Sequence, residues 1–476
     1  MADNPTGTAG VGLPDSAAAE IALPLKRPGF GVDWTQGSIP LNLLKLSWPM
    51  IVGSSLNMIG PTIDVIWVGK LGAAAVAGVG VAGVAVQMVM SGMMGMATGM
   101  RAMIARAIGA GDTKSAENIA TQAMIFNGIL STILAAVGYV VAEPILRLMG
   151  LEQEVVTDGA AYLRVVCLSC LPMSLRFMCE GSMQAAGDSF RPMTVTIVYR
   201  LFHIALCPFL IFGWWVFPKM GVVGAGMTNI FSQTLGLIIS LWILYTGRTR
   251  LKLVFKGIRL DWGIVWRIVK IGIPSSVMGV QMTLGAWVFI LLISPFGTTA
   301  VAAHTIWQRI EMVLMMPVMG LGMGAGVLAG QNLGAGKPAR AVRSGWIAGF
   351  IAEAFMLFWA LVIFLTAESI VRVFSSEPAL VEMGSNFLRI ACAYYTVFAF
   401  APVFQTCIAG AGDTVPPMLL GILGTWVLQL PLAYFLPRIT DWGVYGIRWA
   451  MVFNAVIGTS GFVAYYVWGP WKRKVI

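Results

Sequence analysis

The sequence predicts an all-α integral membrane protein in which twelve transmembrane helices form two parallel six-helix repeats, an N-lobe and a C-lobe, around a central cavity. Of the 476 residues, 58% are hydrophobic and only 11% are charged, whereas an average soluble protein carries about 25% charged residues. So apolar a chain cannot bury all of its apolar surface in one core, and the surplus is expected to face lipid. The sequence also repeats itself after 225 positions.

Twelve apolar runs follow one another, each close to the roughly 20 residues that a helix needs to cross a bilayer. In chain order they are 43–68, 73–100, 120–141, 162–183, 193–216, 222–245, 268–294, 300–329, 346–366, 387–408, 418–436 and 444–467. They predict a mobile cytoplasmic tail (1–40), an N-lobe with helices one to six (41–246) and a basic cytoplasmic linker (247–266). A C-lobe with helices seven to twelve (267–469) and a basic cytoplasmic C-terminus (470–476) complete the chain.

The repeat needs no gap from the first helix of each half through the fourth. Lys45 aligns with Lys270, Pro49 with Pro274, Gly109-Ala110-Gly111 with Gly334-Ala335-Gly336, and Gly187-Asp188 with Gly412-Asp413. Chance similarity between apolar segments would not keep one register across loops. Because six helices return the chain to its starting side, the halves are expected to be parallel copies about an axis along the membrane normal, as in transporters.

The distribution of charge predicts the orientation. The net charge is +10, which in a soluble chain would suggest a nucleic-acid partner. Here six Lys and Arg residues lie at 248–267 and six more at 337–343 and 472–474, while the opposite loops carry only Lys70, Arg147, Lys219, Arg372 and Arg438. Basic loops stay on the cytoplasmic side. We therefore expect a multi-pass plasma (inner) membrane protein with both termini cytoplasmic, and no nucleic-acid partner.

Several function classes lack their motifs. The nearest match to an ATP-binding loop, Gly334-Ala335-Gly336-Lys337, runs into Pro338 where Ser or Thr is required. With two histidines and no hydrolase or metalloprotease pattern, no enzyme activity is predicted. The Cys167/Cys170 pair lies inside an apolar run and is interpreted as packing. We expect no cofactor, no metal site and no ATP-binding subunit; the partners are a small-molecule substrate and the lipid bilayer, and no oligomeric state is assigned.

Ionisable residues inside a membrane usually mark ion or substrate paths. Asp64 in the first apolar run follows Gly60-Pro61, a pair expected to break the helix and to free carbonyls toward a cation. We therefore predict that Asp64 marks an ion or substrate path. The alternative is a carboxylate at the outer surface that pairs with Lys70.

Arg200, His203 and Cys207 in the fifth run are spaced so that they share one helix face. Counted along the helix, His203 and Cys207 approach the level of Asp64, and Thr228 enters from the sixth run. An Asp64/His203 pair is expected to take up and release a proton near neutral pH. The alternative is that Arg200 pairs with some carboxylate and His203 with a backbone carbonyl.

The remaining polar residues of the apolar runs receive less specific roles. Four residues are assigned to the substrate cavity: Arg200, Gln87, Gln281 and Glu311. The alternative for Glu311, which is near Arg309, is a position at the interface between two helices. Arg176 and Glu180, four residues apart, predict a structural ion pair. The glycines at 92, 95, 99, 320 and 324 predict close helix approach.

The sequence resembles the multidrug and toxic compound extrusion (MATE) family from about Leu43 to its end. The resemblance rests on Asp64-Val-Ile-Trp-Val-Gly-Lys-Leu-Gly72, Gln184-Ala-Ala-Gly-Asp188, Pro208-Phe-Leu-Ile-Phe-Gly213, Ala302-Ala-His304 and Gly330-Gln-Asn-Leu-Gly-Ala-Gly336. It implies two six-helix lobes, rocker-type alternating access, and export of a solute against inward H⁺ or Na⁺. It also implies that Asp64 is the cation-coupling aspartate of the first helix and that Thr228 acts beside it.

Two departures from the family pattern bear on the coupling ion. His203 and Cys207 stand where many relatives have Asn and Asp, and Gln281-Met282 and Phe398 lie where another branch has carboxylates. Loss of oxygen ligands disfavours Na⁺, which prefers oxygen donors as Ca²⁺ does.

Three hypotheses follow. The first is an antiporter that exports amphipathic organic cations and drugs in exchange for H⁺, with Na⁺ the less favoured ion, by alternating access. The second is an exporter of an organic anion or metabolite held by Arg200. The third is a binding or structural membrane protein that has lost coupling.

Overall fold

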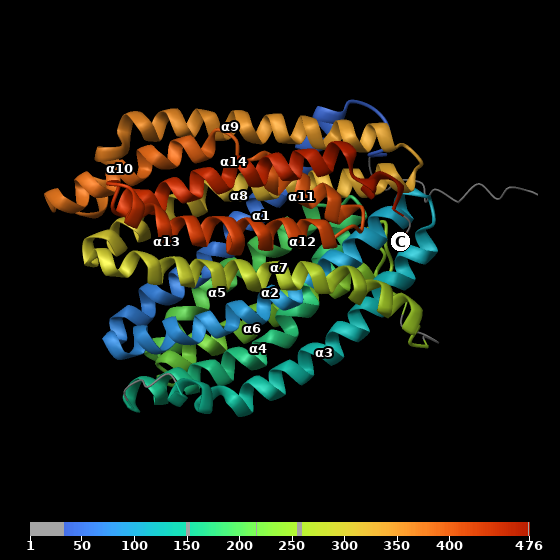
Figure 1. Cartoon of the computed structure of the whole chain (residues 1–476). Helices are drawn as coiled ribbons and strands as arrows, with labels where there is room; N and C mark the ends of the chain where they lie inside the picture. The colour runs from blue at the N-terminus through green and yellow to red at the C-terminus, as the bar shows by residue number, and fades with distance from the viewer. Residues whose placement is uncertain (1–32, 149–152, 216, 255–258, 475) are drawn as a thin grey trace, which may run out of the picture.

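The computed structural model describes residues 33–148, 153–215, 217–254, 259–474 and 476. The first half folds into α1 (Ile39–Val68), α2 (Ala73–Gly109), α3 (Thr113–Leu148), α4 (Gln153–Ala185), α5 (Phe190–Phe212) and α6 (Val222–Tyr245). The second half folds into α7 (Trp262–Ile293), α8 (Thr298–Gly334), α9 (Pro338–Phe374), α10 (Pro378–Tyr395), α11 (Phe400–Gly410), α12 (Val415–Ile422), α13 (Leu430–Ile439) and α14 (Val444–Trp468). The helices run side by side in one bundle, with α3 at one edge and α9 at the other (Figure 1).

Two of the predicted spans are irregular. The tenth is bent by 49° between α10 and α11, where Pro402 in the first turn of α11 cannot donate a backbone hydrogen bond. The eleventh passes from α12 to α13 through a π-helical segment, Leu423–Gln429, just before Pro431, which leaves another carbonyl without its usual donor.

The described helices agree with the twelve predicted spans. Ten are long and apolar enough to cross a membrane, or eleven when α10 and α11 count as one span. The 37-residue helix α2 covers the second predicted run but is not among these helices. Most helices extend beyond the predicted apolar runs; α7, for example, begins at Trp262, inside the stretch that the sequence assigns to the linker, because the Asp261 side chain accepts hydrogen bonds from the Gly263 and Ile264 amides.

The 225-residue repeat is visible in the helix bounds. α2 and α8 begin and end at positions that differ by 225, and so do the first residues of α3 and α9. The turns before α3 and α9 contain Gly111 and Gly336, with φ of 80° and 69°, and the turns after α4 and α11 contain Gly187 and Gly412, with φ of 91° and 85°. Only glycine adopts such dihedral angles without strain, so the repeat preserves the turns as well as the spans.

The two lobes meet through glycines of α2 and α8. A Cβ on Gly95 would lie 2.4 Å from the Ser276 backbone nitrogen of α7, and one on Gly99 would lie 2.5 Å from the Ile268 oxygen. In the other half, a Cβ on Gly320 would lie 2.9 Å from the Ile51 nitrogen of α1. The predicted close helix approach is confirmed at Gly95, Gly99, Gly320 and Gly324, where it joins the lobes to each other, but not at Gly92, where an added Cβ would meet nothing within 4 Å.

Both ends of the described chain lie at one end of the bundle (Figure 1), which we call the basic end because the described basic segments 248–254, 259–267, 337–343 and 472–474 belong to it. Trp34 Nε1 donates a hydrogen bond to the Gly187 oxygen at 3.0 Å. The C-terminus lies at the same end (Figure 1), where Lys474 pairs with Asp413 at 2.8 Å. Trp471 is fully buried, so the predicted C-terminal segment packs against the bundle.

The lobes are closed against each other at the basic end. A Cβ on Gly109 at the end of α2 would lie 2.0 Å from the Gln331 oxygen of α8, and one on Gly334 would lie 2.1 Å from the Arg106 oxygen of α2. Arg106 also donates to the Ala411 oxygen at 3.1 Å, and Gln331 donates to the Ala185 oxygen at 2.8 Å. These contacts hold the two halves together at this end.

Candidate functional site

A buried polar site lies in the N-lobe, where α1, α5 and α6 meet. α1 brings Asp64, α5 brings His203 and Cys207, and α6 brings Thr228. The turn from α5 to α6 is fixed by Gly213, whose φ is 72° and whose added Cβ would lie 2.6 Å from the Lys219 nitrogen. This tight turn sets α6 antiparallel beside α5, so that their polar residues face the same point of α1.

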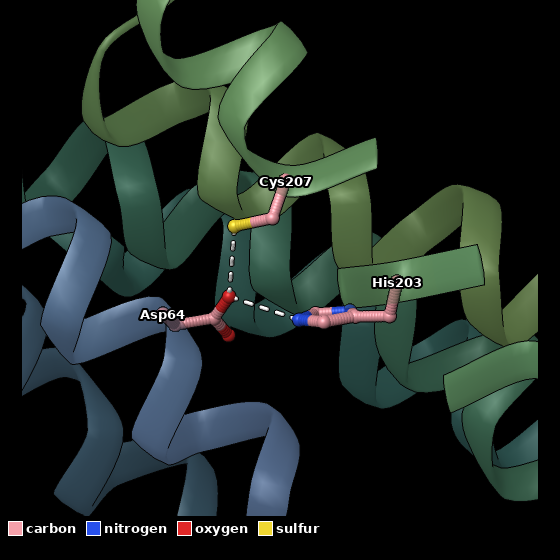
Figure 2. Close-up of side chains that lie close together, drawn as sticks. All are labelled: Asp64, His203 and Cys207. Carbon is pink, nitrogen blue, oxygen red and sulfur yellow. Dashed lines mark hydrogen bonds and ion pairs between the residues drawn. The ribbon is translucent and has the colours of Figure 1, made fainter. Parts of the chain in front are cut away.

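Asp64 is the centre of the site. It is 4% exposed, and its Oδ1 lies 3.0 Å from Nε2 of His203 and 3.5 Å from Sγ of Cys207, which donates to it (Figure 2). Its other oxygen, Oδ2, accepts a hydrogen bond from Nδ2 of Asn229 on α6 at 3.1 Å. Both carboxylate oxygens therefore have partners, as a buried carboxylate requires.

The hydrogen bonds of His203 determine where its protons lie. Its Nδ1 is 3.2 Å from the Ser232 hydroxyl, and that hydroxyl donates its single proton to the Asn229 backbone oxygen at 3.1 Å. The hydroxyl therefore accepts from Nδ1–H. The contact between Nε2 and Asp64 Oδ1 then needs one further proton, held either by the imidazole or by the carboxyl group. A single hydrogen bond therefore joins the imidazole and the carboxyl group.

The alternative that pairs Asp64 with Lys70 at the surface is wrong. The Lys70 ammonium lies over the Trp67 ring, 4.4 Å from its centroid, while Asp64 is buried. The alternative partner for His203, a backbone carbonyl, is also wrong, because both of its ring nitrogens contact side chains.

The predicted helix break at Gly60-Pro61 is wrong as well. α1 continues from Ile39 to Val68 without interruption. Pro61 has no N–H to donate to the Asn57 carbonyl one turn earlier, and Arg200 supplies the missing donor, with its Nη2 3.3 Å from the Asn57 oxygen. The Asn57 carbonyl, which was expected to face a bound cation, therefore contacts the guanidinium group of Arg200.

Arg200 is the second charged group of the site and lies one turn of α1 from Asp64. It is 5% exposed, and Nη2 also lies 3.4 Å from Asn57 Oδ1. Its guanidinium stands 5.1 Å from the Tyr199 ring centroid, and its Nε has no hydrogen-bond partner. The predicted carboxylate partner is absent from the described residues. The shared face of Arg200, His203 and Cys207 is confirmed, since all three contact α1.

Thr228 and two unpredicted residues complete the site on α6. Thr228 is fully buried, and its hydroxyl donates to the Gly224 oxygen at 2.8 Å. Asn229 and Ser232 contact Asp64 and His203 directly. The only signal for them in the sequence is their spacing from Thr228, which is too common in apolar helices to single them out.

The other predicted cavity residues have separate surroundings. Gln87 on α2 is exposed. Gln281 on α7 is buried and accepts a hydrogen bond from Trp426 at 3.2 Å, and its Nε2 has no partner. Glu311 on α8 is half-buried. The Arg176–Glu180 ion pair on α4 is confirmed at 2.5 Å, and Gln233 also accepts from Arg176 at 2.7 Å.

A second buried cation lies in the C-lobe and was not predicted. Arg448 on α14 is 2% exposed and donates to Nδ1 of His304 at 2.8 Å. Its guanidinium lies 4.4 Å from the Trp307 ring centroid and 4.1 Å from that of Phe387. These aromatic faces stabilise the charge where lipid and protein exclude water.

A pocket of about 540 Å³ lies elsewhere, at the basic ends of α5 and α6. Its lining includes Asp188, Arg191, Trp242 and Arg248 and none of the predicted cavity residues.

Comparisons with known proteins agree with this architecture. A family model described as MatE matches residues 49–209 and 274–435. The probable multidrug resistance protein NorM of Thermotoga maritima is 26% identical over 440 residues, which cover 91% of this chain and 93% of that protein. The probable multidrug resistance protein YoeA of Bacillus subtilis is 25% identical over 436 residues, covering 90% and 93%.

Two solved structures share the fold. A MOP superfamily transporter from Pyrococcus furiosus, described as having a binding pocket of reverse polarity, has a TM-score of 0.86 at 24% identity, covering 94% of this chain and 99% of that one. A multidrug resistance MATE family transporter in an outward-facing conformation has a TM-score of 0.85 at 24% identity, covering 92% and 97%.

Proposed function

Because the chain belongs to the MATE family of membrane transporters, we propose that it is a secondary active antiporter that exports amphipathic organic cations in exchange for H⁺ by alternating access. It is a multi-pass membrane transporter and not an enzyme. Its relatives carry names of multidrug resistance proteins, which supports a broad range of organic solutes. We further propose that it resides in the plasma (inner) membrane with the basic end, and hence both termini, facing the cytoplasm.

The observation that carries proton coupling is the buried contact between His203 Nε2 and Asp64 Oδ1 at 3.0 Å. One proton occupies this contact, and either group can hold it. When Asp64 loses the proton to the outside or gains it again, the charge of the site changes by one unit in surroundings that exclude water, which is costly enough to bias a conformational equilibrium. In this mechanism Asp64 carries the proton, His203 tunes its release, and Thr228 and Cys207 line the site.

The ligand set supports H⁺ over Na⁺. The groups that contact Asp64 directly are an imidazole nitrogen, a thiol and an amide NH₂. A hard cation such as Na⁺ would need oxygen donors in their place.

The closure at the basic end supports alternating access. With that end toward the cytoplasm, the lobes are shut on the inside by the contacts of Gly109 and Gly334. Asp64 lies four residues, or about 6 Å, from the opposite end of α1. The conformation is thus the one in which the site would exchange protons with the outside.

A second candidate function rests on Arg200. This cation is buried, and in the described part of the chain no carboxylate lies within ion-pair distance of it. An uncompensated buried guanidinium favours an anionic ligand. The second candidate is therefore export of an organic anion or metabolite through the same fold.

The experiment that tests these proposals is transport in proteoliposomes under an imposed pH or Na⁺ gradient, with an ethidium-like dye and, separately, a labelled dicarboxylate. We expect ΔpH to drive dye transport in the wild type and Asp64→Asn to abolish it. The matched control is Glu353→Gln, which neutralises a buried carboxylate of α9 in the other lobe and should leave coupling intact.

The other outcomes separate the alternatives. Undiminished dye transport in Asp64→Asn would show that Asp64 does not couple transport. Dicarboxylate transport that is lost in Arg200→Ala would favour the anion exporter, whereas dye transport largely retained in that variant agrees with the first proposal. A wild type that responds to neither gradient would favour a protein without coupling.

A further inference from the structure

The side chains around Asp64 form a set of metal ligands that proton coupling does not require. Asp64, His203 and Cys207 each offer one ligating atom, and the three atoms lie within 4.8 Å of one another. All three side chains are buried, and they point toward one another from α1 and α5 (Figure 2). A carboxylate, an imidazole and a thiol together are typical of zinc sites.

The distances between these atoms fit a tetrahedral ion. Zinc binds carboxylate oxygen and imidazole nitrogen at roughly 2.1 Å and thiolate sulfur at about 2.3 Å, so tetrahedral angles place oxygen about 3.4 Å from nitrogen and about 3.6 Å from sulfur. In the structure, Oδ1 of Asp64 lies 3.0 Å from Nε2 of His203 and 3.5 Å from Sγ of Cys207. At these two contacts, movements of a few tenths of an ångström would admit the ion, and Nε2 and Sγ lie within 4.8 Å of each other. A fourth position would remain for water.

The surrounding hydrogen bonds already orient the ligands. Nδ1 of His203 donates to Ser232, which leaves Nε2 facing the two other ligands. Asn229 holds the second oxygen of Asp64 at 3.1 Å and leaves Oδ1 for the metal. Such partners fix the tautomer and the ring orientation in established zinc sites.

The charges also balance. A divalent ion with one carboxylate, one thiolate and a neutral imidazole gives a neutral site, so its burial in the membrane carries no net charge. The soft sulfur ligand favours Zn²⁺ and its neighbours in the first transition row over Na⁺, Mg²⁺ or Ca²⁺, which prefer oxygen. The ion would enter from the end opposite the basic end, about 6 Å away along α1.

We propose that Asp64, His203 and Cys207 bind one zinc-class divalent cation, and that the bound metal blocks transport. The inhibition, but not the binding, rests on the proposed function. The metal takes up Oδ1 of Asp64 and Nε2 of His203, the two atoms between which the coupling proton lies. The carboxylate then cannot exchange a proton, and the transporter stops.

Binding is tested on the purified full chain, freed of any polyhistidine tag, by titration with Zn²⁺ against a chromophoric chelator and by absorption spectra with Co²⁺. We expect one Zn²⁺ per chain and a thiolate-to-cobalt charge-transfer band in the near ultraviolet. Cys207→Ser should abolish the band, and both Cys207→Ser and His203→Gln should weaken Zn²⁺ binding by at least about tenfold.

Matched controls come from the C-lobe. Cys392→Ser and His304→Gln remove a buried thiol and the other histidine of the chain, and both should bind the metal as the wild type does. Monodispersity and melting temperature are compared for all variants. If Cys207→Ser does not fold, His203→Gln decides. Wild-type affinity in a folded His203→Gln or Cys207→Ser variant would overturn the proposal, and so would a wild type without a stoichiometric site.

Transport measurements distinguish the metal-site proposal from the proposed transport function. Zn²⁺ on both sides of the membrane should inhibit ΔpH-driven dye transport in the wild type and spare any transport that Cys207→Ser retains. Site-specific binding without inhibition would leave the metal site standing and refute both the block and the coupling role of Asp64. A wild type that binds Zn²⁺ but responds to no ion gradient would refute the proposed function alone.

Discussion

The contact between α2 and α8 at the basic end offers a direct test of alternating access, through the substitution Gly109→Ala. The new Cβ would lie 2.0 Å from the Gln331 carbonyl oxygen and 2.7 Å from its carbon, whereas ordinary contact begins at 3.4 Å. Because these are backbone atoms, they cannot rotate out of the way. The helices would have to separate by about 1.4 Å at this point.

The expected magnitude follows from the cost of overpacking. Forcing a methyl group into a well-packed contact costs about 1–3 kcal/mol. The conformation that is closed at the basic end is destabilised by this amount. A conformation in which α2 and α8 have separated at that end is not destabilised. The ratio of closed to open molecules should therefore fall by about 5–150-fold. Gly334→Ala should act in the same direction, because its Cβ would lie 2.1 Å from the Arg106 oxygen.

The assay is a distance measurement by double electron–electron resonance between spin labels at Lys114→Cys on α3 and Ala339→Cys on α9. Both positions are exposed at the basic end, and the six native cysteines are buried. Gly109→Ala should shift the distribution to longer distances. Gly92→Ala on the same helix is the control, since its Cβ would meet nothing within 4 Å. An unchanged distribution in a folded Gly109→Ala protein would refute the reasoning.

Three further substitutions test contacts inside the N-lobe. Glu180→Gln leaves the buried Arg176 charge unpaired and should destabilise the protein by about 3–5 kcal/mol, measured as a lower melting temperature in detergent. Gly60→Ala should displace Arg200, whose Nη1 lies 1.7 Å from the added Cβ, and should cost about 1.5–3 kcal/mol through lost charged hydrogen bonds. Asn229→Ala removes the donor to Oδ2 of the site carboxylate and should slow ΔpH-driven transport, measured as the initial rate of dye uptake, while leaving dye binding unchanged.

Each of these has a matched comparison. Glu143 takes part in ion pairs that are partly exposed to solvent. Glu143→Gln removes this carboxylate and should change the melting temperature little. Gly53→Ala on α1 meets nothing within 4 Å and should be neutral. Asn454→Ala removes a side-chain amide of the C-lobe, bonded to Gln429, and should leave coupling intact. Equal effects in a variant and its comparison would contradict the corresponding assignment.

The helices were largely predictable because membrane burial constrains composition over long segments. The run 222–245 coincides with α6, and the start of α2 at Ala73 was also predicted. The ends of other helices were less accurate, as in α2, which continues past Arg101 and Arg106 to Gly109. Hydropathy reports where the lipid ends, whereas a helix ends only where its capping residues and turns allow.

The site was predictable only in part. Asp64, His203 and Cys207 stand out because ionisable and reactive groups are rare in apolar helices. Asn229 and Ser232 do not stand out, since amides and hydroxyls occur there routinely. The role of Arg200 toward the Asn57 carbonyl was missed because hydropathy and spacing do not reveal how α5 docks on α1.

The sequence by itself determined the membrane class, the twelve spans, the repeat and the family, because each of these depends on the amino-acid composition or on the order of residues along the chain. The tertiary structure alone decided which atoms meet. Helical spacing placed His203 and Cys207 near the level of Asp64, but these residues are 139 and 143 positions from it in the chain, and only the packing of α5 on α1 shows that their side chains touch its Oδ1 atom. The closure of the lobes at Gly109 and Gly334 was likewise invisible, because a contact between two distant helices depends on their relative position, which local sequence does not encode.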